Sequence, residues 1–269
     1  MTLTHVRPWA VDEGGRPVVW DPTDVGHAVI AGITRTGKSK GSQSIIAGTL
    51  TPWIQYTGID PSAGLLKPLK VFSERPGDFV LGSDEDFLNR AVALLERLVA
   101  VMRERIAALG WAEKVENFST EMPAVVVVLE EYANLLVMAE SSGKDGKKLR
   151  AQIVALVGSL LREGAKVGID VFTILQRPEA AILHDRAQYS VRITYRQDNA
   201  DSVKMLLDAP EKEDVSRIVG LRPGRGVLSD NGQGLVWFQT PNPDYSTYVE
   251  TVRDRIYTGH TPLLEENNE

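Results

Sequence analysis

The sequence predicts an α/β fold with a largely parallel central sheet flanked by helices. Three observations support it. Short apolar segments alternate with amphipathic ones along the chain. The apolar run Ala124–Leu129, rich in valine, indicates a strand buried on both faces, as in the centre of a parallel sheet. A glycine loop, residues 32–39, joins a predicted strand to a predicted helix.

Composition and charge restrict the possible functions. The chain has 269 residues, 43% hydrophobic and 25% charged, which is enough apolar material for a globular core. It has no cysteine and 4 histidines, which argues against disulfides and against thiolate or histidine metal sites. No apolar stretch reaches the roughly 20 residues needed to cross a bilayer, so we expect a soluble, cytoplasmic protein without membrane insertion. The net charge of −6 predicts that any nucleic-acid contact is local, in a loop or a pore.

The N-terminal half predicts a lead-in segment and the first strands and helices. Residues 1–26 are the lead-in, with a turn and a short strand. A strand at His27–Ala31 runs into the glycine loop, and the following helix extends from about Gly37 to Leu50. A second strand follows at Trp53–Ile59, and 61–82 is loop with short elements. Apolar residues at helical spacing between Leu88 and Leu109 predict a long helix.

The C-terminal half continues the alternation and ends in a hairpin. The predicted helix is Leu149–Arg162, and the predicted strands are Ile169–Leu175 and Val191–Tyr195. Residues 226–228 and 235–238 flank Asp-Asn-Gly, which predicts a C-terminal β-hairpin. We expect one domain over 27–258 and a frayed acidic tail over 259–269.

The glycine loop is a complete Walker A motif and predicts a nucleotide site. Two glycines let the backbone bend closely around phosphate, and the loop amides and helix N-terminus then cradle it. Lys38 would pair with the β- and γ-phosphates, and Ser39 would bind Mg²⁺, so ATP and Mg²⁺ are the expected cofactors. The alternative is a glycine-rich surface turn. The predicted nucleotide-binding residues are Gly32, Thr34, Arg35, Thr36, Gly37, Lys38 and Ser39.

Two adjacent acids follow the valine strand in the arrangement of a Walker B motif. Glu130 would hold the metal through water, and Glu131 would act as general base on the attacking water. The alternative is a pair of solvated carboxylates at a strand end. Together with Walker A, this motif predicts a RecA-like P-loop NTPase.

The strand Ile169–Leu175 ends in a polar residue, Gln176. At this place Gln176 could hydrogen-bond the γ-phosphate or the attacking water and act as a sensor. It could equally be a polar strand end before the turn at Pro178. Position alone leaves the two interpretations open.

Several segments in order resemble the FtsK/SpoIIIE family of DNA-pumping motors, over about residues 14–251. The segment Val128–Leu135 resembles the extended Walker B of the family, and Leu175–Pro178 resembles its Gln-Arg-Pro segment. The Thr-Arg-Thr-Gly-Lys-Ser form of the loop looks closest to actinobacterial conjugation and phage or mobile-element members. Other similar segments are 15–21, 59–61, 168–169 and 192–196.

The resemblance implies a hexameric ring that threads double-stranded DNA and hydrolyses ATP between subunits. It implies that Lys38, Ser39, Glu130 and Glu131 act as above, and that Gln176 is the sensor. It makes Arg177 a pore residue that contacts DNA, the alternative being a surface arginine in a salt bridge. Lys204 falls near the second pore loop of the family.

The resemblance also implies an arginine finger, for which the sequence offers several candidates. The family carries it where this chain has Ala165. We select Arg162, one helical turn earlier, over Lys166, Arg103 and Arg105. Each of these could instead be a solvated cation on a helix face.

The leading hypothesis is therefore an ATP-driven ring motor for double-stranded DNA. The rival hypothesis is a protein-moving or coupling ATPase of a secretion or conjugation apparatus, which the acidic net charge and few pore cations favour. A third is a regulatory nucleotide-binding module, against which the presence of Lys38 and Glu131 argues. The chain carries the motor core without membrane anchor or winged-helix tail, so we expect a stripped-down motor or a fragment. Orientation on DNA would come from a membrane-anchored or conjugation partner protein.

Overall fold

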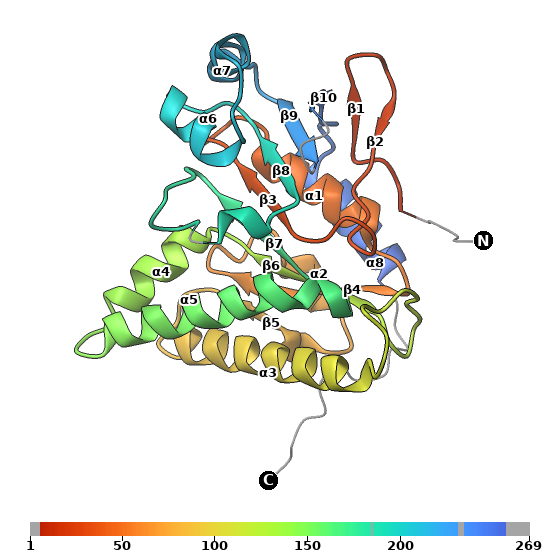
Figure 1. The fold of residues 1–269 in the computed structure, drawn as a ribbon, viewed down its shortest axis with the longest axis vertical. Helices are drawn as coiled ribbons and strands as arrows, with labels where there is room; N and C mark the ends of the chain where they lie inside the picture. Colours follow the sequence, from red (N-terminus) through yellow and green to blue (C-terminus); the bar gives the residue numbers. More distant parts are fainter. Residues whose placement is uncertain (1–5, 184, 231–233, 257–269) are drawn as a thin grey trace.

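The computed structural model describes residues 6–183, 185–230 and 234–256. Within them, one 10-stranded sheet has the strand order β2-β1-β10-β9-β8-β3-β7-β6-β4-β5. Helices cover both of its faces (Figure 1). This arrangement confirms the predicted α/β fold.

The parallel half of the sheet contains the five strands that sequence patterns predicted there, and one more at 79–81, within the segment expected to be loop with short elements. Strands β3, β7, β6, β4 and β5 pair in parallel, and β8 pairs in parallel with β3. Every residue of β3, β4, β6, β7 and β8 is buried, as expected of strands covered on both faces. The bounds are β3 Ala28–Ala31, β4 Ile54–Asp60, β5 Phe79–Leu81, β6 Ala124–Leu129, β7 Ile169–Leu175 and β8 Val191–Thr194.

The antiparallel half extends the sheet beyond β8. Strands β9 (Arg225–Asp230) and β10 (Leu235–Gln239) pair as the predicted hairpin. Its expected turn, Asn231-Gly232, lies outside the described residues, as does the tail 259–269. The lead-in segment contributes β1 (Ala10–Asp12) and β2 (Pro17–Val18), and β1 pairs with β10.

Two layers of helices enclose the sheet. The predicted helices are present as α1 (Lys38–Thr49), α3 (Phe87–Ala108) and α5 (Gly146–Glu163). Five further helices were not predicted, because each is short and its pattern does not span enough turns to stand out from a loop. They are α2 (Lys67–Phe72), α4 (Tyr132–Glu140), α6 (Ala200–Leu206), α7 (Lys212–Val219) and α8 (Tyr245–Arg255), and single 3-10 turns span Pro76–Asp78, Gly164–Val167 and Arg186–Gln188.

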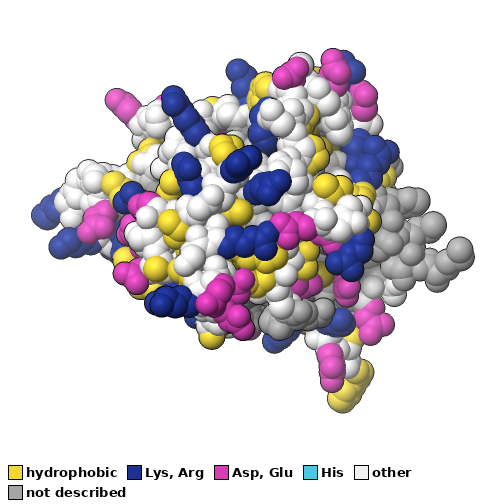
Figure 2. Space-filling model, turned by 90° about the horizontal axis from the view of Figure 1, so that it is seen from above, with side chains coloured by type: hydrophobic (Ala, Val, Ile, Leu, Met, Phe, Trp, Pro, Cys, Tyr) yellow, Lys and Arg dark blue, Asp and Glu magenta, His cyan; other side chains and the backbone are white. Residues whose placement is uncertain are grey.

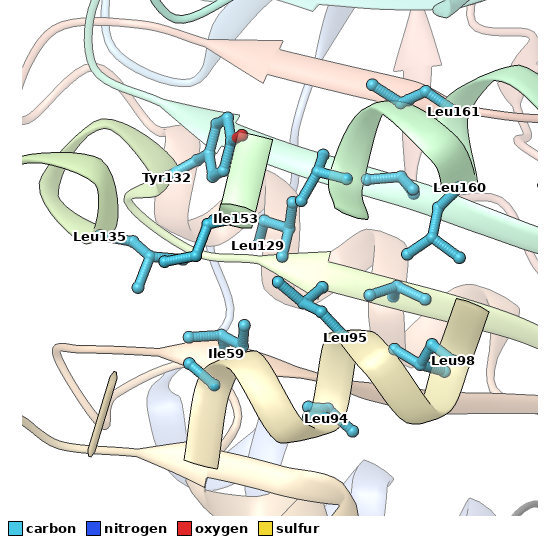
Figure 3. Close-up of a cluster of buried hydrophobic side chains, with 14 of the residues drawn as sticks. Ile59, Leu94, Leu95, Leu98, Leu129, Tyr132, Leu135, Ile153, Leu160 and Leu161 are labelled. Carbon is cyan, nitrogen blue, oxygen red and sulfur yellow. The ribbon is translucent and has the colours of Figure 1, made fainter. Parts of the chain in front are cut away.

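Strand β6 shows how the sheet divides the core. Val125, Val127 and Leu129 enter the cluster beneath α3, α4 and α5, where Leu95 and Ile153 also pack (Figure 3). Val126 and Val128 enter the cluster on the opposite face. Alternation along the strand therefore fills two cores, and each buried side chain contributes roughly 2 kcal/mol. No helix in the described part of the chain has the length and apolar character to cross a membrane.

Candidate nucleotide site

The Walker A loop connects β3 to α1 in a conformation that requires glycine. Gly37 has φ 109, and a Cβ at this position would lie 2.8 Å from Cα of Gly224. Helix α1 has no side-chain cap at its N-terminus, so its first amides are available to another acceptor. Phosphate oxygens are suitable acceptors for such a helix end.

Three predicted residues from three elements meet beside this loop. Nζ of Lys38 lies 3.2 Å from Oε1 of Glu131. Nε2 of Gln176 donates to the same oxygen at 3.1 Å. They converge because β3, β7 and β6 are adjacent parallel strands whose carboxyl ends share one edge. The sequence predicted each residue separately, and the sheet topology brings them together.

The backbone of Glu131 adopts a left-handed conformation that non-glycine residues rarely use. Its φ and ψ are both 47, and Arg35 of the Walker A loop has φ 64. Such conformations cost on the order of 1 kcal/mol or more and are concentrated at functional sites. Here the conformation holds Glu131 at the start of α4 with its carboxylate toward Lys38.

A cleft of about 440 Å³ contains this group. Its walls include the Walker A loop, Glu131 and Gln176. The opposite wall, Pro223, Gly224 and the segment 239–242, was not identified from the sequence. The amide of Gly224 donates to the carbonyl of Thr36 at 2.8 Å, which attaches that wall to the loop. No local motif marks these residues, because the hairpin brings them to the site from far along the chain.

Glu130 has a different environment from Glu131. Burial raises the pKa of Glu130 to about 8, with repulsion from Asp60 and Glu131 acting in the same direction and Lys38 opposing it. Its Oε2 is buried and has no hydrogen-bond partner. Glu130 and Ser39 line a second cavity, of about 290 Å³.

The second cavity fits a magnesium ion. The Ser39 hydroxyl and the Glu130 carboxylate are hard oxygen donors, and an orphaned carboxylate oxygen needs a cation or a donor. The described residues contain no group of three or more His, Cys, Asp or Glu that could hold a metal by themselves. Mg²⁺ commonly uses one or two protein ligands together with phosphates and water, so a pair of donors is sufficient.

The arginine-finger candidates lie away from the cleft of their own chain. Arg162 forms an ion pair with Asp185 at 3.2 Å and its side chain is 52% exposed. Arg105 donates to the carbonyl of Val167 at 2.9 Å, and burial lowers its pKa. Arg103 and Lys166 are exposed. None of these four lines the cleft.

The two predicted DNA contacts are both on the surface. Nη2 of Arg177 lies 2.5 Å from Oδ2 of Asp198, so the salt bridge considered as the alternative is present. The Arg177 side chain is nevertheless 60% exposed, and an exposed ion pair is weak enough to exchange for phosphate. Lys204 is exposed on α6. Figure 2, seen from the end of the molecule where α6 and α7 lie, shows Lys and Arg side chains spread over that face.

Known sequences similar to this chain include DNA motors and a transfer protein. It is 26% identical over 211 residues to "DNA translocase FtsK" of Campylobacter jejuni, covering 72% of this chain and 21% of that protein. It is 26% identical over 253 residues to "Transfer protein TraSA" of Streptomyces ambofaciens, covering 87% of this chain and 60% of that protein. The chain thus spans about a fifth of the first relative. No family model matches the chain.

Solved structures support the fold. The conjugation coupling protein TcpA of pCW3, solved in monomer form with ATPγS, has a TM-score of 0.71 at 18% identity, over 94% of this chain and 75% of that one. The type VII secretion ATPase EccC of Thermomonospora curvata has a TM-score of 0.63 at 21% identity, over 97% of this chain and 32% of that one. Together with the sequence relatives, they confirm the resemblance to FtsK/SpoIIIE-type ATPases that the motifs indicated.

Proposed function

We propose that this chain is an ATP-hydrolysing motor subunit that translocates double-stranded DNA as part of a ring. The observation that carries the proposal is the meeting of Lys38, Glu131 and Gln176 at the cleft beside the open N-terminus of α1. The relatives called DNA translocase and transfer protein support DNA as the substrate.

The proposed chemistry is transfer of the γ-phosphoryl group to water. Amides of residues 34–37 and of the α1 N-terminus bind the phosphates. Lys38 leaves Glu131 to neutralise the β- and γ-phosphates, and Glu131 then accepts a proton from the attacking water. Gln176, already within hydrogen-bond distance of Glu131, orients that water. Mg²⁺, held by Ser39 and Glu130, would neutralise charge on the phosphate oxygens.

The position of the arginines supports a ring. None of the finger candidates lines the cleft of its own chain, which agrees with a finger supplied by a neighbouring subunit, and we select Arg162. An isolated subunit should therefore hydrolyse ATP slowly. We expect a hexamer, in which Arg177 and Lys204 face DNA in the pore, with orientation supplied by a membrane-anchored or conjugation partner protein.

The second candidate function is a protein-moving or coupling ATPase. The net charge of −6 and the pairing of Arg177 with Asp198 favour it, because both weaken attraction to DNA. The similarity to a secretion ATPase is consistent with it.

The deciding experiment measures ATPase rate against protein concentration, with and without long double-stranded DNA at low salt. For a DNA motor, the rate per subunit should rise with concentration and rise again with DNA, and added salt should reverse the second rise. The double variant Arg177→Ala/Lys204→Ala should keep the basal rate and lose the stimulation. Arg90→Ala is the matched control, since Arg90 is an exposed, ion-paired arginine on α3. A rate that rises with concentration but ignores DNA would favour the protein-moving function and remove the DNA assignments.

A further inference from the structure

The cavity that contains Glu130 extends along one side of α1. Ser39 lines both this cavity and the nucleotide cleft, so the two spaces meet at that residue. Ser42 and Gln43 line the cavity as well, and Glu130 faces them from the end of β6. Residues 39, 42 and 43 have the spacing i, i+3 and i+4, which places them on one face of a helix.

Three residues that line this cavity each carry a buried polar atom without a hydrogen-bond partner. These atoms are Oγ of Ser42, Oε1 of Gln43 and Oε2 of Glu130. Ser42 is 1% exposed and Gln43 is 8% exposed, so bulk water does not solvate these side chains. An unsatisfied buried polar group costs roughly 1–3 kcal/mol, so three in one cavity indicate that something normally occupies it.

Ser39 is exposed, and two further polar residues of the cavity have partners within the protein. The hydroxyl of Ser62 donates to Oδ1 of Asp60 at 2.7 Å. The hydroxyl of Tyr245 donates to the carbonyl of Gly64 at 2.8 Å. The orphaned atoms are therefore confined to the side formed by α1 and the end of β6, next to the predicted metal ligands.

The chemistry of the orphaned atoms defines the occupant. An amide oxygen only accepts hydrogen bonds, the Glu130 carboxyl only accepts them when it is ionised, as it would be beside a cation, and a serine hydroxyl can accept one. They therefore require a donor-rich occupant. Water bound to a divalent cation is such a donor, and Mg²⁺ retains several of its waters in proteins. At about 30 Å³ per water, the cavity of about 290 Å³ holds several.

We propose that Ser42 and Gln43 are positioning residues for the metal, accepting hydrogen bonds from the water shell of the divalent cation that accompanies the nucleotide. This inference rests on the proposed function, because it assumes that a metal–nucleotide complex binds at Ser39 and Glu130. Outer ligands of this kind orient the inner ones, and their loss typically costs 10–100-fold in metal affinity.

The test is Gln43→Leu in the full chain. Leucine has a similar size and no oxygen, so without metal the variant should be as stable as wild type or more stable, because it removes an unsatisfied acceptor. Its affinity for a non-hydrolysable ATP analogue without metal should be unchanged. Its Kd for Mg²⁺ in the presence of that analogue should rise about 10-fold or more. Calorimetry and the paramagnetic resonance of Mn²⁺ substituted for Mg²⁺ measure this affinity without turnover.

Gln55→Leu is the matched control. Gln55 is also a buried glutamine, 6% exposed, with an orphaned side-chain atom, but it lines a different cavity beside Leu50 and Ile54. The Gln55→Leu variant should bind Mg²⁺ with unchanged affinity. Ser42→Ala is a second, smaller change, expected to weaken Mg²⁺ binding in the same direction.

Each outcome bears on the inference in a distinct way. Weakened Mg²⁺ binding in Gln43→Leu and Ser42→Ala but not in Gln55→Leu supports it. If wild type binds Mg²⁺ with nucleotide and the two cavity variants bind it equally well, the inference is overturned while the proposed function stands. A wild-type chain that binds no nucleotide would overturn the proposed function and the inference together.

Discussion

Two carboxyl groups that are largely shielded from solvent, Glu130 and Asp170, lie at opposite ends of neighbouring strands, and their surroundings differ. Burial raises the pKa of each to about 8. Each also has a side-chain oxygen without a hydrogen-bond partner. By these criteria alone, either could be assigned to an active site.

Their neighbours separate them. Glu130 lines a cavity, is next to the strained Glu131 and is close to Lys38. Asp170 is 1% exposed, and its Oδ1 lies 3.3 Å from Nδ1 of His27. That nitrogen accepts a hydrogen bond from the amide of Val171, while Nε2 of His27 donates one to the carbonyl of Leu161. Burial lowers the pKa of His27 to about 4, so the ring is neutral and provides no cation. A buried acid indicates function only where a cavity and a counter-charge accompany it.

The largest effect that would test this contrast is expected from Lys38→Ala. Loss of the cation that neutralises the phosphates should lower turnover by about 10³-fold or more. Lys70→Ala removes a lysine that donates to the carbonyl of Phe79 on the outside of the sheet and should leave turnover unchanged. Steady-state ATPase assays measure both, and a Lys38→Ala variant that retains turnover would refute the assigned cleft.

A loss of the same order or smaller is expected from Glu131→Gln. Glutamine has the same shape but cannot accept the proton of the attacking water, so hydrolysis should slow by roughly 10²–10⁴-fold. Nucleotide affinity should be retained, because the cradle of backbone amides is unchanged. Single-turnover hydrolysis and equilibrium binding separate the two quantities. Wild-type hydrolysis by this variant would exclude Glu131 as the general base.

Asp170→Asn should affect stability rather than catalysis. The folded-state pKa of Asp170, about 8, exceeds its ordinary value of 3.8, so the folded chain binds more protons between these values. The free energy of unfolding that Asp170 contributes therefore falls as pH rises to about 8. His27, with its pKa lowered from 6.5 to about 4, has the opposite slope, but only below about pH 6.5.

Between pH 6.5 and 9, therefore, the pH dependence of the free energy of unfolding reports the carboxyl groups and not His27. Denaturant unfolding should show Asp170→Asn gaining stability relative to wild type across this window, on the order of 1–2 kcal/mol. Its ATPase rate at pH 7 should match wild type. A pH-independent difference in stability would show that Asp170 is not protonated in the fold. A loss of turnover would show that Asp170, like Glu130, is needed for activity.

Local sequence patterns predicted much of the fold and the candidate residues of the site. The valine run of β6 and the Walker A spacing predict their structures because alternation and glycine geometry act over a few residues. The same is true of β7, whose predicted bounds Ile169–Leu175 agree with the structure. Short helices such as α4 and α6 escaped prediction, since their formation depends on the surfaces they pack against.

The sequence by itself predicted the candidate site residues: Lys38, Ser39, Glu130, Glu131 and Gln176 each follow a strand or open a helix in a recognisable pattern. Only the tertiary structure decided which of them meet. It placed Lys38 and Gln176 on one oxygen of Glu131, paired Arg162 with Asp185, and closed the cleft with Gly224 from the distant hairpin. The reason is physical: local patterns set backbone conformation, whereas these contacts join residues that only the sheet order brings within reach.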